Sequence, residues 1–505
     1  MRQETSKINK LETFFNPKSV AVIGASKKIG KAGNVIFSNF AQNKRRGIFK
    51  GEIYPVNPNE DSVLGFKCYP SIKYIPDDLE SIVIVVPAAI VKDVMKDAVE
   101  KGVDAAIIIT AGFSEIGNHE CEEKIVEMAR KGGIRILGPN CIGVFDSYTG
   151  VDTLFLPETK ILKTGDVMVA TPRPMPGQMA MISQSGAFGA AALDYLTGQQ
   201  IGISKFVSFG NKCDVDESEI LQLLYNDQKT NVILLYAESI NEGRKFMEIS
   251  RQVTKEKPIV ALKSGQTEAG ARAASSHTGA LSGSDQIYDA AFLQTGVIRA
   301  RNMREFFNMG KALVFQPPTS GRNIAILTDA GGPGVMAADE CEIRGLRITK
   351  LSNDTLSKFE DLKKKKILPE FSTNLNPVDL TGSATSKMFE YSLRLLLDEP
   401  NTDGIIVIGI HHLPAIEEDF VDLIGNIMLE YRKPIIGCDI GETEMATYIR
   451  SRFEKFGIPA YPSPEEASQA MVALVNYGLY LKSIGCLEEY LKRFDEKIKL
   501  NLKKV

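Results

Sequence analysis

Residues 19–26 read Ser-Val-Ala-Val-Ile-Gly-Ala-Ser, and residues 27–33 continue with Lys-Lys-Ile-Gly-Lys-Ala-Gly. An apolar run that ends in a glycine turn and leads into a helical pattern predicts a β-strand, a loop and an α-helix. Glycines let the backbone approach a phosphate, and a helix N-terminus favours an anion. Ser26 occupies the position of the second glycine in the dinucleotide fingerprint GxGxxG, so the match to that motif is weak.

The same pattern recurs along the first segment, about residues 14–145. Short apolar runs predict further strands, and helical stretches lie between them, at 53–56, 82–86, 105–109 and 134–137 for the strands and 89–101 and 120–131 for the helices. This alternation predicts a parallel sheet wrapped by helices, an α/β Rossmann-like domain.

Four strand ends of this segment carry turn residues, and ligands of such folds bind beyond the carboxyl ends of the strands. Any one of these loops is more often an ordinary strand-to-helix turn, but four together favour a bound ligand. The candidate ligand-binding residues lie in these loops: Gly24, Ala25, Ser26, Lys28, Gly30, Asn57, Val86, Pro87, Ala88, Thr110, Ala111, Gly112 and Asn140.

Composition excludes several classes of protein. The chain has 505 residues, which predicts two to four domains, and it is 44% hydrophobic and 24% charged, as in ordinary globular proteins. A net charge of −3 argues against broad nucleic-acid or membrane-surface binding. The seven cysteines are scattered without a CxxC pair, which predicts neither a disulfide frame nor a metal site. With no apolar signal core at the N-terminus, we expect a cytoplasmic protein.

The second segment, about residues 177–297, repeats the strand–turn–helix pattern. Residues 179–189 read Met-Ala-Met-Ile-Ser-Gln-Ser-Gly-Ala-Phe-Gly, in which Ser185 is a good N-cap and Gly186 opens an alanine-rich helix. The free N–H groups at that helix start would suit a phosphate, although an N-cap without a ligand is common. A buried strand at 232–237 ends in Glu238, and a carboxylate at that position can orient an imidazole.

His277 is one of four histidines, with His119, His411 and His412, and it alone stands in a run of small residues at 271–276. Small neighbours leave an imidazole uncovered and the backbone free to move, so we expect a mobile loop here. Histidine can act as a covalent nucleophile. The alternative that this stretch leaves open is a loop histidine that makes only local hydrogen bonds.

The third segment, about residues 321–478, opens with another strand and a glycine loop in which Gly331 and Gly332 could form a second anion cradle. It predicts a flavodoxin-like module. The pair His411-His412 follows a buried strand, where adjacent side chains point to opposite faces, so a structural role is favoured over a metal site. The Pro-rich stretch 164–177 predicts an exposed loop, and residues from 487 onward predict an amphipathic helix.

Taken in order, these motifs resemble the alpha chain of succinyl-CoA synthetase and, more closely, the alpha chain of the ADP-forming acyl-CoA synthetases of the acetate–CoA ligase type. The resemblance covers residues 14–463, and the 39 residues that separate Glu238 from His277 are close to that family's spacing. It implies that the first segment binds CoA through the residues named above. It also implies that His277 carries a phosphoryl group, that Glu238 steadies it, and that Ser185, Gly186, Gly279, Gly331 and Gly332 bind phosphate.

The resemblance further implies the reaction acyl-CoA + ADP + phosphate ⇌ acid + CoA + ATP, through an acyl phosphate and a phospho-histidine. No covalently bound cofactor or metal is expected on this chain. No ATP-grasp domain is visible, so we expect a separate ATP-grasp beta subunit that binds ADP or ATP with Mg²⁺, in an assembly of two alpha and two beta chains. The other substrate is a small carboxylic acid or its CoA thioester.

The predicted architecture is a CoA-binding Rossmann-like domain at 1–150, a flavodoxin-like domain with the phospho-histidine at 151–315, a second flavodoxin-like ligase domain at 316–480, and an amphipathic tail at 481–505. Two other functions compete with the ligase. One is a catalytically inactive CoA-binding sensor or scaffold, against which the Glu238 and His277 pair argues. The other is a dinucleotide dehydrogenase, which lacks both the second glycine and the acidic residue about 20 residues further on.

Overall fold

The computed structural model describes residues 10–278, 284–416 and 419–502. The chain divides into two compact units, Met1–Thr295 and Gly296–Val505, hereafter the first and second units. This division does not test the domain boundaries expected near residues 150, 315 and 480, which stay predictions. The predicted fold class is confirmed, because each unit is built from parallel β-sheet and flanking helices.

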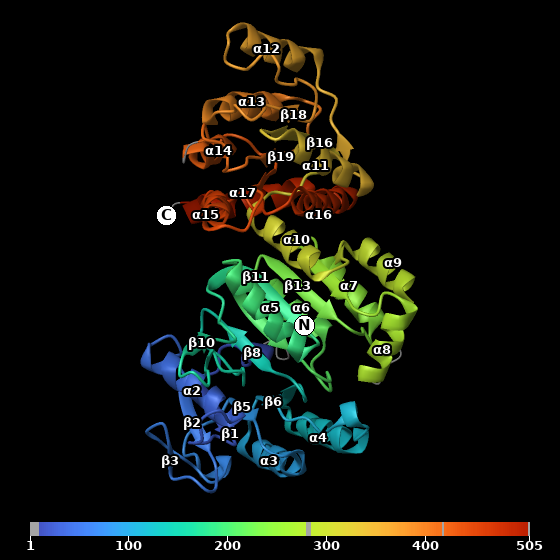
Figure 1. Ribbon diagram of the computed structural model, residues 1–505. Helices are drawn as coiled ribbons and strands as arrows, with labels where there is room; N and C mark the ends of the chain where they lie inside the picture. The colour runs from blue at the N-terminus through green and yellow to red at the C-terminus, as the bar shows by residue number, and fades with distance from the viewer. Residues whose placement is uncertain (1–9, 279–283, 417–418, 503–505) are drawn as a thin grey trace. The chain divides into compact units, whose positions relative to one another are not determined.

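The first sheet of the first unit has five parallel strands in the order β2-β1-β5-β6-β7. Their bounds lie within two residues of those predicted: β1 Ser19–Ile23, β2 Glu52–Val56, β5 Ser81–Ile84, β6 Ala105–Ile108 and β7 Arg135–Leu137. Helices connect them, namely α2 Ala32–Arg45, α3 Ala88–Lys101 and α4 His119–Gly132, and a small hairpin β3 Ser62–Val63 and β4 Phe66–Lys67 follows β2. Helices α3 and α4 lie side by side (Figure 1) over one apolar face of the sheet.

The strand order of this sheet places its binding crevice. The chain runs from β1 to β2 on one side and then returns to β5 on the other side of β1. Ligands of doubly wound sheets bind at the carboxyl ends of the strands where this direction changes. The turn at Gly24, which follows β1 directly, therefore lies at the switch point.

The second sheet of the first unit contains the run β14-β13-β11-β12-β8, in which only β8 is antiparallel to its neighbour. The strands are β8 Gly143–Asp146, β11 Pro176–Ser183, β12 Ile203–Ser208, β13 Val232–Ala237 and β14 Ile259–Lys263. The helices are α5 Gly186–Gly198, α6 Glu217–Asn226, α7 Gly243–Val253, α8 Glu268–Thr278 and α9 Asp285–Thr295. Strand β11 is the neighbour of β13 although β12 lies between them in the sequence, which brings Gln184 beside Glu238.

The Pro-rich stretch 164–177 is not a plain loop. It contributes β10, Val167–Val169, to an antiparallel hairpin with β9, Thr159–Ile161, and its last residues begin β11. The expectation of exposure was right only for the first part of the stretch: residues 164–169, which include β10, are exposed, whereas Thr171, Pro172 and Pro174 are buried. The loop was predicted from the prolines at 172, 174 and 176. These prolines follow the short apolar run that forms β10, so they do not interrupt it.

The second unit is built on the parallel sheet β17-β16-β19-β20-β21, with β18 also paired to β16. The strands of this sheet are β16 Asn323–Thr328, β17 Arg347–Ile348, β18 Val378–Asp379, β19 Gly404–Ile408, β20 Ile435–Cys438 and β21 Ala460–Tyr461. The residues of the unit also include β15 Ile298–Ala300, which is not part of this sheet. Its helices are α10 Met303–Phe315, α11 Gly331–Ile343, α12 Asn353–Lys364, α13 Ser386–Asp398, α14 Asp419–Met428, α15 Glu444–Lys455, α16 Pro464–Ser483 and α17 Leu487–Leu502.

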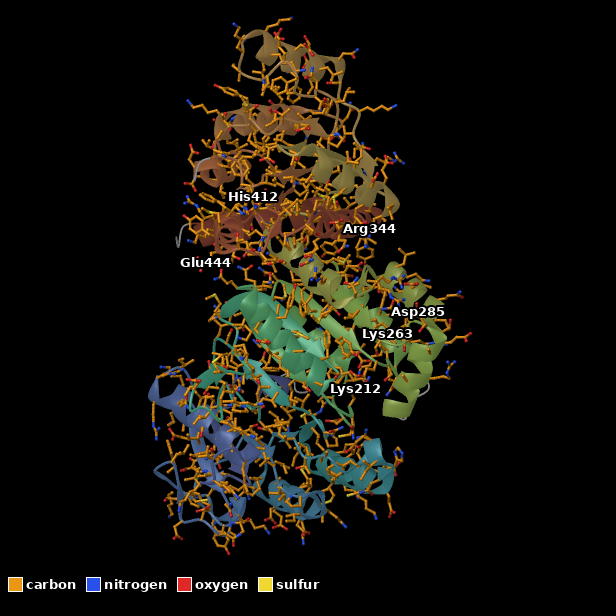
Figure 2. The ribbon with its side chains drawn as sticks, viewed as in Figure 1. Lys212, Lys263, Asp285, Arg344, His412 and Glu444 are labelled. Carbon is orange, nitrogen blue, oxygen red and sulfur yellow. The ribbon has the colours of Figure 1, made fainter. Side chains whose placement is uncertain are left out.

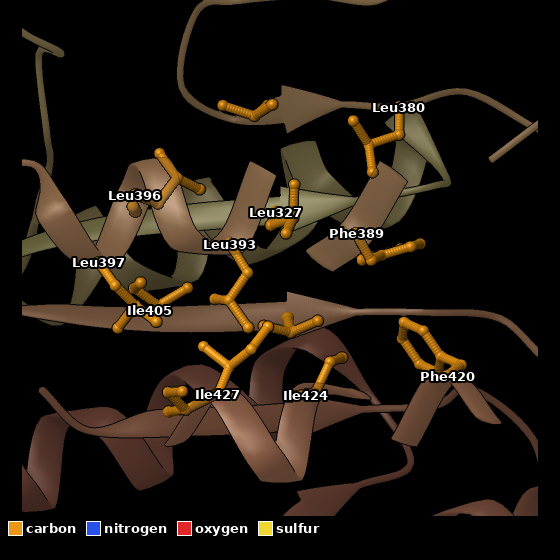
Figure 3. Close-up of a cluster of buried hydrophobic side chains, with 14 of the residues drawn as sticks. Leu327, Leu380, Phe389, Leu393, Leu396, Leu397, Ile405, Phe420, Ile424 and Ile427 are labelled. Carbon is orange, nitrogen blue, oxygen red and sulfur yellow. The ribbon is translucent and has the colours of Figure 1, made fainter. Parts of the chain in front are cut away.

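The core of the second unit lies between this sheet and helices α13 and α14. Leu327 of β16 and Ile405 of β19 meet Leu393 and Ile424 of the two helices (Figure 3), and all four are fully buried. The predicted C-terminal helix is α17, which packs on α16 of the same unit. The Tyr490 ring lies edge-on to that of Tyr477, with the ring centres 5.2 Å apart.

Candidate functional site

The turn after β1 accepts only glycine. Gly24 has a φ of +97°, and a Cβ there would lie 2.3 Å from the Val85 carbonyl oxygen. Helix α2 approaches the same turn closely, because a Cβ on Gly33 would lie 2.0 Å from the Gly24 carbonyl oxygen. The backbone of the turn is therefore fixed between β5 and the start of α2.

A pocket of about 390 Å³ opens beside this turn, at the carboxyl ends of β1, β2 and β5. Four of the predicted CoA-binding residues line it: Gly24, Asn57, Val86 and Pro87. Sequence reasoning missed one face of α3, which lines the pocket with Ile90, Asp93, Val94 and Asp97. Their spacing of three, four and seven residues is the signal that could have found this face. Pro70, Ser71 and Ile72 carried no such signal.

The other predicted CoA-binding residues do not line this pocket: Ala25, Ser26, Lys28, Gly30, Ala88, Thr110, Ala111, Gly112 and Asn140. Several of them hold the loops together. The Asn57 side-chain amide donates to the Ala25 carbonyl at 2.7 Å, and the Thr110 hydroxyl donates to the Val86 carbonyl at 2.7 Å. Whether they also contact CoA stays a prediction.

The first and second sheets of the first unit meet at Asn211, which the sequence did not single out. Its side-chain amide donates to Glu115 at 2.6 Å and to Glu122 at 2.9 Å, and Asn140 donates to its side-chain oxygen at 3.3 Å. Burial raises the pKa of the Glu115 carboxyl, but hydrogen bonds from Asn211 and from the Gly112 and Phe113 backbone outweigh it and hold the pKa below its usual value. Glu115 therefore stays ionised at this junction.

At the carboxyl edge of the second sheet, Ser185 caps helix α5, as predicted for an N-cap. Its hydroxyl accepts from the Phe188 backbone N–H at 3.2 Å. Gly186, the first residue of α5, lies against Ile142, whose Cγ2 would be 2.7 Å from a Cβ at this position. The helix start therefore reaches the edge of the sheet where the candidate catalytic carboxylate lies.

Glu238 follows the last residue of β13 and is half-buried. Gln184, which stands directly before Ser185, accepts hydrogen bonds from the backbone N–H groups of Glu238 and Ser239 at 2.9 and 3.0 Å. The structure therefore brings three predicted site residues, Ser185, Gly186 and Glu238, to neighbouring ends of β11 and β13.

The expectation that His277 stands in a loop was wrong, because its backbone belongs to the last turn of helix α8. The run Ala271–Ala274 contains three alanines, which have the highest helix propensity, and the small side chains were mistaken for a sign of irregular structure. The His277 side chain lies outside the described residues, as does Gly279, so the predicted pairing of Glu238 with His277 stays a prediction.

Gly331 and Gly332 open helix α11 at the carboxyl edge of the second unit's sheet. A Cβ on Gly331 would lie 2.8 Å from a carboxylate oxygen of Asp379, so this helix start already faces a negative charge. Nearby, burial raises the pKa of Asp329 to about 7, and the carboxylates of Asp439 and Asp379 add to the rise against the opposing effect of the Ile410 N–H. Phosphate binding at Gly331 and Gly332 stays a prediction.

The His411-His412 pair follows β19 in a turn, and the expectation that the two rings point to opposite faces was wrong. The rings lie together, with centres 4.0 Å apart, because the alternation of a strand ends at Ile408. His411 Nδ1 bonds to the buried Asp439 carboxylate at 2.8 Å. Burial raises the pKa of Asp439, and the bond from His411 offsets part of this rise.

Within residues 10–278, 284–416 and 419–502, no group of three or more His, Cys, Asp or Glu side chains is placed to hold a metal ion. Over the same ranges, no helix combines the length and apolar character needed to cross a bilayer.

Three family models match the chain in succession. They describe a CoA binding domain at residues 18–146, a succinyl-CoA ligase like flavodoxin domain at 176–313 and a ligase-CoA domain at 324–479. The matches cover the pocket beside Gly24, the edge that carries Ser185 and Glu238, and the start of α11.

Named relatives match almost the whole chain. The acetate–CoA ligase (ADP-forming) I subunit alpha of Pyrococcus furiosus is 40% identical over 482 residues, which are 92% of this chain and 97% of that protein. The acetate–CoA ligase (ADP-forming) of Methanocaldococcus jannaschii is 38% identical over 96% of this chain and 66% of that protein. Among solved structures, the dinucleotide forming acetyl-coenzyme A synthetase 1 of Ca. Korarchaeum cryptofilum, in complex with phosphate and ADP, is 36% identical with a TM-score of 0.82, over 96% of this chain and 98% of that one.

Proposed function

Because this chain belongs to the family of the ADP-forming acetate–CoA ligases, we propose that it interconverts an acyl-CoA and its carboxylic acid with formation of ATP from ADP and phosphate. It is an acid–thiol ligase of the alpha-subunit type. Its substrates are CoA or acyl-CoA, phosphate and the nucleotide, and the CoA-binding domain of residues 18–146 takes the thioester.

The proposed reaction runs in three steps. Phosphate attacks the thioester carbonyl, the carbon–sulfur bond breaks, and acyl phosphate and CoA form. A ring nitrogen of His277 then attacks the phosphorus of the acyl phosphate, and the carboxylate leaves. ADP finally takes the phosphoryl group from His277 to give ATP. Splitting a difficult transfer into two covalent half-steps is the gain from the histidine.

The observation that carries this proposal is the grouping of Ser185, Gly186 and Glu238 at neighbouring strand ends. The N-terminus of α5 offers N–H groups and the positive end of a helix dipole to a phosphate that carries negative charge. Glu238 offers the carboxylate that would hold the imidazole of His277 in one orientation and support its positive charge while the phosphoryl group moves. Both features serve phosphoryl transfer to a histidine.

We also propose a partner for the nucleotide step. The Pyrococcus furiosus relative is named as a subunit alpha, and this chain spans 66% of the Methanocaldococcus jannaschii relative, which carries no subunit designation. An ATP-grasp beta subunit that binds Mg²⁺ with ADP or ATP would supply the rest, and two copies of each chain would form the enzyme. Relatives named for acetate and for 4-hydroxybutyrate are both similar to this chain, so the panel of acyl groups for testing includes both.

One experiment tests the proposal with the chain alone. The chain is incubated with each acyl-CoA of the panel and radiolabelled inorganic phosphate, and free thiol and protein-bound label are followed. We expect phosphate-dependent release of CoA with at least one acyl group, and a label that is lost in acid and kept in alkali. Tight binding of NAD in calorimetry, together with no binding of CoA, would contradict the proposal.

A further inference from the structure

The backbone that follows β13 is held by side chains rather than by a neighbouring strand. Beyond Ala237, where the strand ends, four polar backbone groups of residues 238–240 each have a side-chain partner. The partners come from three separate stretches of the first unit: the turn between β11 and α5, the loop after β12, and helix α9. This short segment, hereafter the Glu238 segment, carries the carboxylate that the proposed function needs.

Gln184 makes most of these contacts. Its side-chain oxygen accepts from the N–H groups of Glu238 and Ser239 at 2.9 and 3.0 Å, and its side-chain NH₂ donates to the Ser239 hydroxyl at 3.3 Å. Its own backbone N–H donates to the Tyr236 carbonyl at 3.1 Å, so the residue is anchored to the carboxyl end of β13. Both ends of the amide group are thereby used.

Two other side chains hold the segment from other directions. Lys212 is almost fully buried, and its ammonium group donates to the Ser239 carbonyl at 2.8 Å while it pairs with the buried Glu217 carboxylate at 3.1 Å. Figure 2 shows Lys212 in the first unit. The Tyr288 hydroxyl accepts from the Ile240 N–H at 3.3 Å. A buried lysine requires paired and hydrogen-bonded surroundings, and these contacts provide them.

Gln184 also joins the Glu238 segment to the helix start that we expect to bind phosphate. It directly precedes Ser185, the N-cap of α5, and Ser183 before it donates its hydroxyl to the Ser185 carbonyl at 2.7 Å. A shift of Gln184 would therefore move the carboxylate and the phosphate-binding end of α5 relative to each other. A reacting group displaced by about 1 Å can lose about 100-fold in rate.

We propose that Gln184 is a positioning residue, which sets the Glu238 carboxylate in register with the N-terminus of α5 for phosphoryl transfer to His277. The inference rests on the proposed function. It assigns Gln184 no contact with substrate, because each of its polar side-chain atoms already bonds to the Glu238 segment.

The chain offers a matched control on the same strand. Gln178 lies near the amino end of β11, and its side-chain oxygen accepts from the Asn231 side chain just before β13, as Gln184 contacts the segment just after β13. A glutamine that links β11 to the β13 region is removed in each of the variants Gln178→Met and Gln184→Met. In both, methionine puts an apolar side chain of similar length in its place. Only the second change touches the candidate site.

The test compares the rate of His277 phosphorylation from acyl-CoA and labelled phosphate in the two variants and the wild-type chain. We expect Gln184→Met to lower kcat by about 10–100-fold, the usual scale for a lost orienting partner, with KM for acyl-CoA within about twofold. Gln178→Met should stay within about twofold of wild type in both. Equal rates for the two variants, or an equal loss in kcat and in acyl-CoA binding, would overturn the inference.

A second variant keeps the inference testable if Gln184→Met folds poorly. Gln184→Glu retains acceptors for both backbone N–H groups but places a negative charge beside Glu238. We expect it to keep more activity than Gln184→Met and to shift the acid limb of the pH–rate profile to higher pH, because the added charge favours protonated groups nearby. An unshifted profile would contradict the inference. A wild-type chain without label would instead overturn the proposed function itself, and the inference with it.

Discussion

The carboxyl edges of the two flavodoxin-like sheets are built alike but carry different charged groups. In each, a buried strand, β11 or β16, ends in a short turn from which a helix starts at a glycine, Gly186 or Gly331. At the first edge a serine hydroxyl caps the helix, and a buried lysine lies close to Glu238. At the second edge, carboxylates of Asp329, Asp379 and Asp439 influence one another.

This difference shows that a strand, a glycine and a helix in sequence predict the geometry of an anion site but not its charge. The helix dipole contributes only modestly to the affinity for an anion, and the negative charge of a carboxylate beside Gly331 lowers that affinity. We therefore propose the edge that carries Glu238 as the place of the covalent chemistry, and we expect the second edge to bind phosphate weakly at neutral pH.

The largest effect is expected from His277→Ala, which removes the proposed nucleophile from the first edge. The overall reaction and the protein-bound label should fall by roughly 10³-fold or more, as for the loss of a covalent nucleophile. CoA binding, which involves another sheet, should stay within about threefold. His411→Gln, in the acidic edge of the second unit, is the control, and a loss of label in that variant alone would reverse the assignment.

A smaller effect is expected from Glu238→Gln, which keeps the size of the side chain and removes its charge. The rate of His277 phosphorylation should fall by about 10–100-fold, because an uncharged amide supports the imidazolium less well. The exposed Glu242 lies four residues further on, and Glu242→Gln provides the control. Equal labelling rates for the two variants would remove Glu238 from the site.

The acidic edge predicts a pH dependence of stability in the second unit. Asp329 has a folded pKa of about 7 and an ordinary unfolded value near 3.8, so the folded state holds a proton that the unfolded state has lost between these values. Its contribution to the free energy of unfolding is therefore present at low pH and is lost as the pH rises toward 7. By linkage, Asp329→Asn should remove about 2 kcal/mol of pH dependence between pH 5 and pH 7.

Denaturant titrations of both proteins at the two pH values measure this. Parallel stability curves for wild type and Asp329→Asn would show that Asp329 ionises normally. That result would contradict the electrostatic difference between the two edges.

The smallest effect concerns Asp379, whose carboxylate lies beside Gly331. Asp379→Asn keeps an oxygen that can accept from the Thr381 N–H, which now bonds at 2.8 Å, but it removes the negative charge. Affinity for inorganic phosphate at the start of α11 should rise about two- to fivefold, the scale of one charge at a helix terminus. A phosphate titration followed by NMR measures it, with Asp354→Asn, on the exposed face of α12, as control. Unchanged affinity would mean that this charge does not govern the site.

Much of the fold could be predicted because it depends on local sequence patterns. The apolar runs of the first sheet place strands such as β1 and β6 to within two residues, and the alternation with helices predicts a parallel sheet. Two of the three local errors come from residue composition. Small residues around His277 suggested a loop where alanines favour a helix, and prolines at 172–176 concealed the short strand β10.

The site could be predicted only in part, because its contacts depend on which strands are neighbours in the sheet. The pairing of Gln184 with the Glu238 segment depends on β11 lying beside β13, which no local pattern states. The same holds for Lys212, whose ammonium group reaches Ser239 from the loop after β12, and for Asn211, which meets Glu115 of the first sheet. Its residue type and its position at a strand end pointed to Glu238, but the residues that hold it could be identified only from the structure.

The most direct test of the account is to locate the phosphoryl group on the protein. The wild-type chain is incubated with acyl-CoA and phosphate, kept at alkaline pH, digested, and the phosphopeptide is sequenced by mass spectrometry. We predict a single acid-labile, base-stable phosphate on His277, absent from His277→Ala. Phosphate on His119, His411, His412 or a serine, with His277→Ala still active, would contradict the account.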